Sequence, residues 1–193
     1  MTCQSGDSTE SIERRPGAEA RVLDPDKSRV AVAMKELKRT GWYWGPLTAS
    51  EAKDKLQDAS DGTFLVRDSS HRDFLLTISV KTPVGPTNLR IEYREGKFRL
   101  DSLVLVKPKL KQFNSVVCLV EYYVVLSRSS QGSEALARPN GTVQLYLSSP
   151  LYTEVPSLQH LSRIAINKSA RNVDELPLPK RLKDFLKEYS HHI

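Results

Sequence analysis

Three short strand-like runs, linked by polar turns, constrain the fold of this chain more than any other feature. They cover residues 63–68, 74–80 and 88–93, and a fourth run at 97–100 follows the tight turn REGK. Successive side chains of a strand point to opposite faces of a sheet, and in each of the three runs the apolar residues favour one face. The four runs therefore predict an antiparallel sheet.

Helical patterns lie on both sides of these runs. Apolar residues recur with helical spacing in residues 28–39 and 112–127. Thr48 and Glu51 have the spacing of a capping box, which predicts that a further helix starts at Thr48. With a last strand at 143–147, this order predicts an α+β fold, in which a central antiparallel sheet is flanked by two helices and preceded by an N-terminal helix.

The composition favours a cytoplasmic protein that binds a small, localised anion. The formal net charge is +6 and the pI is about 9.3, but the lysines alternate with acidic residues rather than forming a basic run. We therefore expect no nucleic acid as partner. The two cysteines, Cys3 and Cys118, are far apart, which argues against a disulfide framework. The N-terminus lacks the pattern of a signal peptide and no run approaches eighteen apolar residues, so we expect no direct membrane insertion.

Arg67 is the most informative single residue, because it is a charged residue that follows the apolar residues of a strand predicted to lie in the core. Phe64 and Val66 lie on the apolar face of that strand, which places Arg67 on the opposite face. If the strands pair in sequence order, Thr77 and Arg90 lie on the same side of the sheet as Arg67.

Two hydroxyl residues, Ser69 and Ser70, directly follow this arginine. Guanidinium groups and hydroxyls that converge on one spot favour a tetrahedral dianion, since the planar fork of arginine can bind two phosphate oxygens at once. The alternative is a purely structural salt bridge, for which the nearby acidic residues are Asp68, Asp73 and Glu92.

The motif GTFLVRDSS, with WYWGPLTASEAKDKL before it and FNSVVCLVEYYV after it, resembles a Src-homology 2 (SH2) domain. This resemblance implies a domain that binds phosphotyrosine peptides, with Arg67 as the buried arginine that binds the phosphate. Ser69 and Ser70 match the phosphate-binding loop and Thr77 matches a helper hydroxyl. Arg90 matches a position beside the tyrosine ring. The chain departs from many SH2 domains in lacking an arginine near the start of the helix that begins at Thr48.

The C-terminal residues resemble a SOCS box. SLQHLSRIAI resembles an Elongin C-binding element, with Leu158 and Leu161 as apolar contacts and Ser162 where cysteine is commoner. LPLP resembles an element that selects the fifth type of cullin; its residues are Leu176, Pro177, Leu178 and Pro179. The alternative for the first element is that Leu158, Leu161 and Ala165 pack onto the chain's own SH2 surface.

An SH2 domain followed by a SOCS box is the arrangement of the suppressor of cytokine signalling family. Residues 1–27 are polar and show no periodicity, so we expect a disordered tail there. The resemblance implies an extended SH2 helix at 28–41, the SH2 domain at 42–148 and the SOCS box at 151–193. It implies the substrate receptor of a ubiquitin ligase that attenuates JAK-STAT signalling. The implied partners are phosphotyrosine tails of cytokine receptors, as in the growth hormone receptor pathway, Elongin B and Elongin C, and a cullin with its RING protein. An adaptor that only competes for receptor docking sites is the alternative.

Signals of catalysis are missing from the sequence. A tyrosine phosphatase loop needs arginine six residues after its cysteine, and neither Cys3 nor Cys118 has one. Gly-rich phosphate loops are absent as well. The four histidines, His71, His160, His191 and His192, show no metal-ligand spacing with cysteines or acids. We therefore expect no catalytic residues, no metal and no cofactor.

Overall fold

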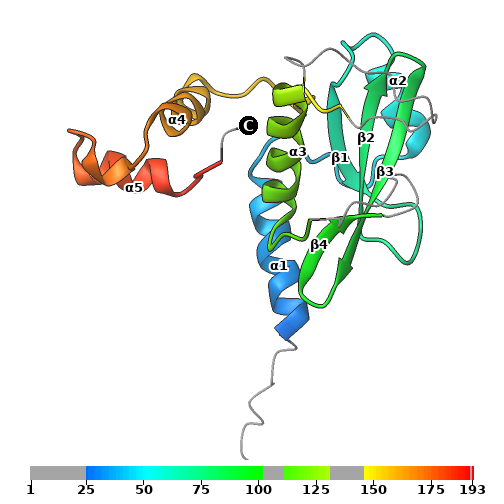
Figure 1. Ribbon diagram of the computed structural model, residues 1–193, viewed down its shortest axis with the longest axis horizontal. Coiled ribbons are helices and arrows are strands. Elements are labelled where there is room, and N and C mark those ends of the chain that lie inside the picture. The colour runs from blue at the N-terminus through cyan, green and yellow to red at the C-terminus, as the bar shows by residue number, and fades with distance from the viewer. Residues whose placement is uncertain (1–24, 102–110, 131–145, 192) are drawn as a thin grey trace, which may run out of the picture.

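The computed structural model describes residues 25–101, 111–130, 146–191 and 193. In the SH2 region the elements are α1 (Pro25–Lys38), α2 (Ala49–Leu56), β1 (Phe64–Asp68), β2 (Leu76–Thr82), β3 (Gly85–Arg94), β4 (Lys97–Leu100) and α3 (Val116–Ser130). Near the C-terminus follow α4 (Leu158–Ser169), the short 3₁₀ helix η1 (Val173–Glu175) and α5 (Lys180–Lys187). Figure 1 shows their arrangement.

The four strands form one antiparallel sheet in the order β1-β2-β3-β4, as the sequence predicts. The register pairs Arg67 with Thr77 and Thr77 with Arg90, so these residues lie side by side across three strands. Helices α1 and α3 pack together on one face of the sheet, while α2 covers the other (Figure 1). The predicted antiparallel sheet with flanking helices is therefore confirmed.

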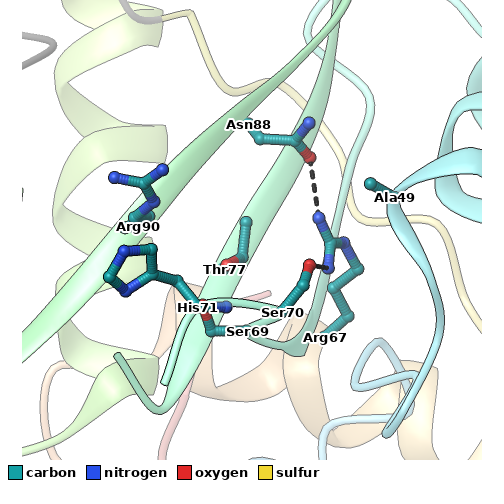
Figure 2. A pocket seen from close by; sticks show the side chains of 8 residues that line it. All are labelled: Ala49, Arg67, Ser69, Ser70, His71, Thr77, Asn88 and Arg90. Carbon is teal, nitrogen blue, oxygen red and sulfur yellow. Dashed lines mark hydrogen bonds between the residues drawn. The ribbon is translucent and has the colours of Figure 1, made fainter. Parts of the chain in front are cut away.

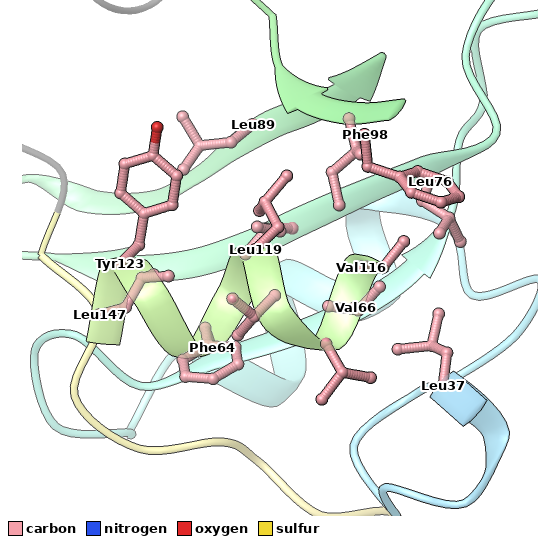
Figure 3. Close-up of a cluster of buried hydrophobic side chains, with 14 of the residues drawn as sticks. Leu37, Phe64, Val66, Leu76, Leu89, Phe98, Val116, Leu119, Tyr123 and Leu147 are labelled. Atoms are coloured by element: carbon pink, nitrogen blue, oxygen red, sulfur yellow. The ribbon is translucent and has the colours of Figure 1, made fainter. Parts of the chain in front are cut away.

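The main core lies between the sheet and α3, with α1 beside it (Figure 3). Phe64 and Val66 of β1 belong to it, whereas Leu65 packs on the opposite face against Ala52 and Leu56 of α2. This alternation is the one that the sequence predicts for β1, and it assigns Arg67 to the α2 face. The other strand and helix residues of the main core include Leu76, Ile78, Leu89, Ile91, Phe98, Val116, Leu119 and Val120.

Helix α2 begins where its sequence predicts. The Thr48 hydroxyl accepts a hydrogen bond from the Glu51 backbone N–H at 3.2 Å, and the Glu51 carboxylate accepts one from the Thr48 backbone N–H at 2.8 Å. This reciprocal pair is a capping box. It fixes the start of α2 beside the end of β1, where Arg67 lies.

Several boundaries differ from the sequence prediction; for example, β2 begins at Leu76 rather than at residue 74, β3 begins at Gly85 rather than at residue 88, and α3 ends at Ser130 rather than at residue 127. Helix α1 begins at Pro25 rather than at residue 28, and proline is tolerated at a first helical position. Helix α3 begins at Val116 rather than at residue 112, because Phe113 forms backbone hydrogen bonds with Phe98 and extends the sheet instead. Residues 143–145 of the predicted last strand lie outside the described residues, and Leu147 is buried in the core without being part of a strand.

Helices α4 and α5 pack on one another and extend from the side of the molecule where α1 and α3 lie (Figure 1). The side-chain amide of Asn167 on α4 donates hydrogen bonds to the carbonyl oxygens of Leu186 at 3.1 Å and Tyr189 at 2.6 Å. The guanidinium of Arg163 lies over the rings of Phe185 and Tyr189. These contacts fix the inner face of α4 on α5 and the segment after it.

The C-terminal end of the chain docks on the SH2 region. Ile193 is 5% exposed and belongs to the main core cluster. The His191 ring lies between two carboxylates, with Nε2 2.6 Å from Glu36 of α1 and Nδ1 3.2 Å from Glu121 of α3. Burial of the ring opposes its charge, but the hydrogen bonds to Glu121 and Glu36 outweigh this effect and raise the pKa of His191 to about 9. At neutral pH an imidazolium therefore joins the tail to both helices.

This ion pair predicts how the stability of the chain depends on pH. The folded state holds the His191 proton more tightly than the unfolded state, whose pKa is near the ordinary 6.5. The contribution is complete below pH 6.5 and is lost as the pH rises through about 9. We expect the thermal midpoint to fall over this range, and to fall less in His191→Gln, as differential scanning fluorimetry measures. Parallel curves for the two proteins would contradict the ion pair.

Candidate functional site

A pocket of about 280 Å³ opens on the α2 side of the sheet (Figure 2). Strands β1, β2 and β3 contribute residues to it, as do the segment after β1 and the first residue of α2. The lining residues are Ala49, Arg67, Ser69, Ser70, His71, Thr77, Asn88 and Arg90. All five residues for which the sequence predicts phosphate contact therefore line one pocket.

Arg67 is only 2% exposed, and neutral oxygen atoms hold its guanidinium. Nε donates to the Ser79 hydroxyl at 3.0 Å, Nη1 to the Asp68 carbonyl at 3.1 Å and Nη2 to the Asn88 side-chain oxygen at 3.2 Å. A guanidinium has five N–H donors. These bonds leave one N–H of Nη2 without a partner among the described residues. Nη1 also makes two longer contacts at 3.5 Å, to the Leu47 carbonyl and the Ser70 hydroxyl, which a stronger acceptor can replace. The open N–H of Nη2 and the weakly bonded N–H of Nη1 together form a fork that can bind two phosphate oxygens.

The three acidic residues considered as salt-bridge partners of Arg67 bind other groups. Asp68 accepts a hydrogen bond from the Tyr43 hydroxyl, Asp73 lies 3.6 Å from the His71 ring, and Glu92 pairs with Arg99 at 2.7 Å. Across the described ranges, no carboxylate forms an ion pair with Arg67. Desolvation by burial lowers the pKa of Arg67, so the protein environment withdraws solvent from this cation without neutralising it. The geometry therefore contradicts a structural salt bridge.

The other pocket residues surround this fork. Ser70 and Thr77 line the pocket, and Figure 2 shows the contact between the Ser70 hydroxyl and Arg67. The Ser69 hydroxyl accepts a hydrogen bond from the His71 backbone N–H at 3.1 Å, which holds the turn after β1. Arg90 lies 5.3 Å from the centre of the Phe74 ring, and its side chain is 43% exposed. It is therefore at the mouth of the pocket, whereas Arg67 is at the base.

Sequence reasoning missed the residues that hold Arg67 in place. Ser79 and Asn88 pair in the β2–β3 register, and the Ser79 hydroxyl donates to the Asn88 oxygen at 2.7 Å. Strand parity already placed both residues on the face of Arg67, so it contained the signal that would have identified them. Ala49 and His71 also line the pocket but belong to loop and helix-start positions that strand parity does not reach.

Helix α4 carries a second candidate site on its outer face. Leu158 is 80% exposed and Leu161 is 43% exposed, while Ser162 and Ala165 are also exposed. Their spacing gives one continuous stripe along the helix. The opposite face, with Ile164, is buried. The described structure therefore does not pack this stripe on the SH2 surface, although the chain's last residues do dock there.

The LPLP segment links η1 to α5. Leu176 and Leu178 are half-buried, whereas Pro177 and Pro179 are exposed. Pro179 is the N-cap of α5, and the Leu178 backbone N–H donates to the Leu176 carbonyl at 2.8 Å. The two exposed prolines therefore stand in a tight, ordered segment on which a partner can dock.

The helices of the described part of the chain include none that is both long and apolar enough to cross a membrane.

Comparisons with known proteins match both parts of the chain. Residues 42–123 match the SH2 domain family and residues 154–187 match the SOCS box family. The chain is 55% identical to Suppressor of cytokine signaling 2 of Bos taurus, over 98% of this chain and 96% of that protein. Identity to the Homo sapiens protein of that name is 59%, over 88% of this chain and 85% of that one.

A second relative is less similar. The chain is 44% identical to the Cytokine-inducible SH2-containing protein of Gallus gallus, over 90% of this chain and 76% of that protein. The family resemblance that the sequence motifs carry is therefore confirmed.

The neutral surroundings of Arg67 predict the effect of adding a charge beside it. Asn88→Asp places a carboxylate near Nη2, where it occupies the fork and repels a dianion. We expect binding of a phosphotyrosine peptide, measured by calorimetry, to weaken at least about tenfold, the equivalent of about 1.4 kcal/mol. Asn114→Asp, an exposed position outside the pocket, makes the same change of charge and is the control. Equal affinities for the two variants would show that Asn88 does not face the ligand.

Proposed function

Because the chain belongs to the suppressor of cytokine signalling family, which joins an SH2 domain to a SOCS box in non-catalytic adaptors, we propose that it is the substrate receptor of a cullin–RING ubiquitin ligase. Its SH2 domain binds phosphotyrosine sites on activated cytokine receptors, of the growth hormone receptor type. The SOCS box recruits the ligase, and the outcome is attenuated JAK-STAT signalling. The chain acts in the cytoplasm.

The observation that carries this proposal is the buried, un-neutralised Arg67, whose Nη2 has one open N–H and whose Nη1 has one that makes only long contacts at 3.5 Å. A phosphate brings about −1.5 to −2 charges at neutral pH, enough to compensate a desolvated guanidinium. Because Arg67 lies at the base of the pocket, only a phosphate on a long side chain reaches it. Phosphotyrosine is long enough, and phosphoserine is too short. Ser69, Ser70 and Thr77 supply further donors, and Arg90 at the mouth lies where it can contact the tyrosine ring.

The second half of the proposal rests on the exposed stripe of α4. Leu158 is 80% exposed and Leu161 is 43% exposed, and contact of these apolar side chains with water is unfavourable. A partner that covers them in a pocket removes this cost. We assign Leu158, Leu161 and Ser162 to Elongin C, which binds together with Elongin B. Leu176, Pro177, Leu178 and Pro179 are assigned to the cullin of the fifth type. Residues 42–148 and 151–193 are our proposed domain limits, and the family matches lie inside them.

The proposed mechanism is tethering, with no covalent step by this chain. The SH2 domain holds the receptor tail while the SOCS box holds the cullin and its RING protein with a charged ubiquitin carrier. Linking the two raises the effective concentration of the carrier near receptor lysines. The docked C-terminus favours this mechanism, because it fixes the SOCS box against α1 and α3 rather than leaving it on a flexible linker.

The phosphate pocket is tested by a change that keeps the charge of Arg67. Arg67→Lys replaces a planar fork by a single ammonium, which cannot bind two phosphate oxygens together. We expect the affinity for a phosphotyrosine peptide, measured by calorimetry, to fall about ten- to a hundredfold, since a charge-assisted hydrogen bond contributes about 1.5–3 kcal/mol.

Arg72→Lys is the matched control for this change. Arg72 lies in the segment after β1 with a side chain that is 94% exposed, and it does not line the pocket. We expect near-normal affinity in this variant. Near-normal binding by Arg67→Lys as well would contradict the assignment of Arg67 as the phosphate ligand.

The ligase role is tested on receptor turnover in cells. The double variant Leu158→Ala with Pro177→Ala removes one proposed Elongin contact and one proposed cullin contact while the phosphate pocket stays intact. We expect it to bind the phosphorylated receptor normally but to lose most receptor ubiquitination, with Val155→Ala, at an even more exposed apolar position, as the control. Unchanged receptor turnover would instead favour an adaptor that only competes for docking sites.

A further inference from the structure

A group of potential metal ligands lies where the C-terminal tail meets α3, apart from the phosphate pocket and the exposed stripe of α4. Cys118 and Glu121 lie one turn apart on α3, and His191 belongs to the docked tail. The thiol sulfur, a carboxylate oxygen and a ring nitrogen all lie within 4.8 Å of one another. Sequence spacing gave no sign of this group, because His191 comes from 70 residues beyond Glu121.

We propose that Cys118, Glu121 and His191 form a zinc-binding site that fastens the tail to α3. Thiolate, imidazole and carboxylate are the three ligand types that zinc uses in proteins. The combination of a soft thiolate with an imidazole selects zinc over magnesium or calcium, which prefer oxygen ligands alone.

The distances suit tetrahedral coordination. Ligand atoms around a tetrahedral zinc ion lie roughly 3.5 Å apart. Nδ1 of His191 and Oε2 of Glu121 are already 3.2 Å apart, and the cysteine sulfur has at most 4.8 Å to span. A movement of about an ångström by the exposed Cys118 side chain therefore completes the set, and solvent access at Cys118 gives the ion a path and a water as fourth ligand.

Glu36 supplies the outer contact that histidine ligands of metals usually have. Its carboxylate lies 2.6 Å from Nε2 of His191, on the side of the ring away from Glu121. A carboxylate on Nε2 orients the ring and keeps a proton on that nitrogen, so that Nδ1 is the nitrogen that binds the metal once its own proton is displaced.

Zinc competes with protons at this site. It replaces the Nδ1 proton of His191 and the thiol proton of Cys118, because both atoms must be deprotonated to bind a metal. Uptake therefore releases protons, and we expect affinity in the micromolar range rather than that of a permanent structural zinc. Such a site responds to the supply of zinc: an occupied site links the SH2 helix α3 to the tail that follows α5, and so restrains the SOCS box. This inference does not depend on which receptor or ligase the chain serves.

The test uses the full chain co-purified with Elongin B and Elongin C and stripped with a chelator. Cobalt(II) and then zinc are titrated into this complex, and the thiolate-to-cobalt absorption band and the thermal midpoint are recorded. We expect one equivalent of metal, a band that zinc abolishes, and a midpoint that rises with zinc. Cys118→Ser should lose the band and the rise in midpoint, and His191→Gln should weaken binding at least tenfold.

Cys3→Ser is the matched control, since it removes the other cysteine of the chain and should leave metal binding unchanged. His191→Gln also removes the ion pairs that hold the tail, so its loss of metal binding has two explanations. Cys118 is exposed and takes no part in those ion pairs, so Cys118→Ser is the decisive variant. Identical cobalt spectra and zinc responses for the wild type and Cys118→Ser would overturn the proposal, and the cluster would then be an ion pair only.

Discussion

A cation that is withdrawn from water and not neutralised is the constraint on which the candidate site depends. Desolvating an ion costs several kcal/mol, yet Arg67 is 2% exposed and donates hydrogen bonds only to neutral oxygens, the shortest being to Ser79, Asn88 and the Asp68 carbonyl. These contacts fix the direction of the guanidinium without cancelling its charge. A bound dianion completes the compensation, and the register that aligns Thr77 and Arg90 with Arg67 places further donors beside it. The same hydrogen bonds that hold Arg67 in place therefore also direct it into the pocket.

The SOCS box also has a feature that is unfavourable without a partner, which is an exposed apolar surface rather than a buried charge. The inner face of α4 is fixed on α5 by Asn167 and the rings around Arg163, whereas the outer stripe from Leu158 has no cover in the described structure. The tail beyond α5 returns to the SH2 core through Ile193 and through the His191 ion pairs. The SH2 domain thus has a cation that no acid neutralises, and the SOCS box has an apolar stripe that nothing in the described structure covers, and each is available to a partner. The tail joins the SH2 domain to the SOCS box.

Sequence reasoning correctly predicted the features that follow from the geometry of a single strand or helix. Strand parity predicted that Arg67, Thr77 and Arg90 share a face, and capping-box spacing predicted the start of α2, because both rules act over a few residues. It missed the start of α3, where pairing of Phe113 with Phe98 overrides helical periodicity. It also missed the contacts of His191 with α1 and α3, which need the three-dimensional fold. The loops at 102–110 and most of 127–141, which we expect to read peptide sequence, lie outside the described residues.

The most direct measurement is arginine-selective ¹⁵N NMR of the chain in its complex with unlabelled Elongins, during titration with phenyl phosphate. A guanidinium has five N–H groups, and the resonances of the arginine that binds the dianion change most on titration. The account predicts that the Arg67 side-chain resonances shift most and that their hydrogens exchange more slowly with water. Resonances of Arg67 that stay in place while only those of Arg90 move would contradict it, because the phosphate would then bind at the mouth.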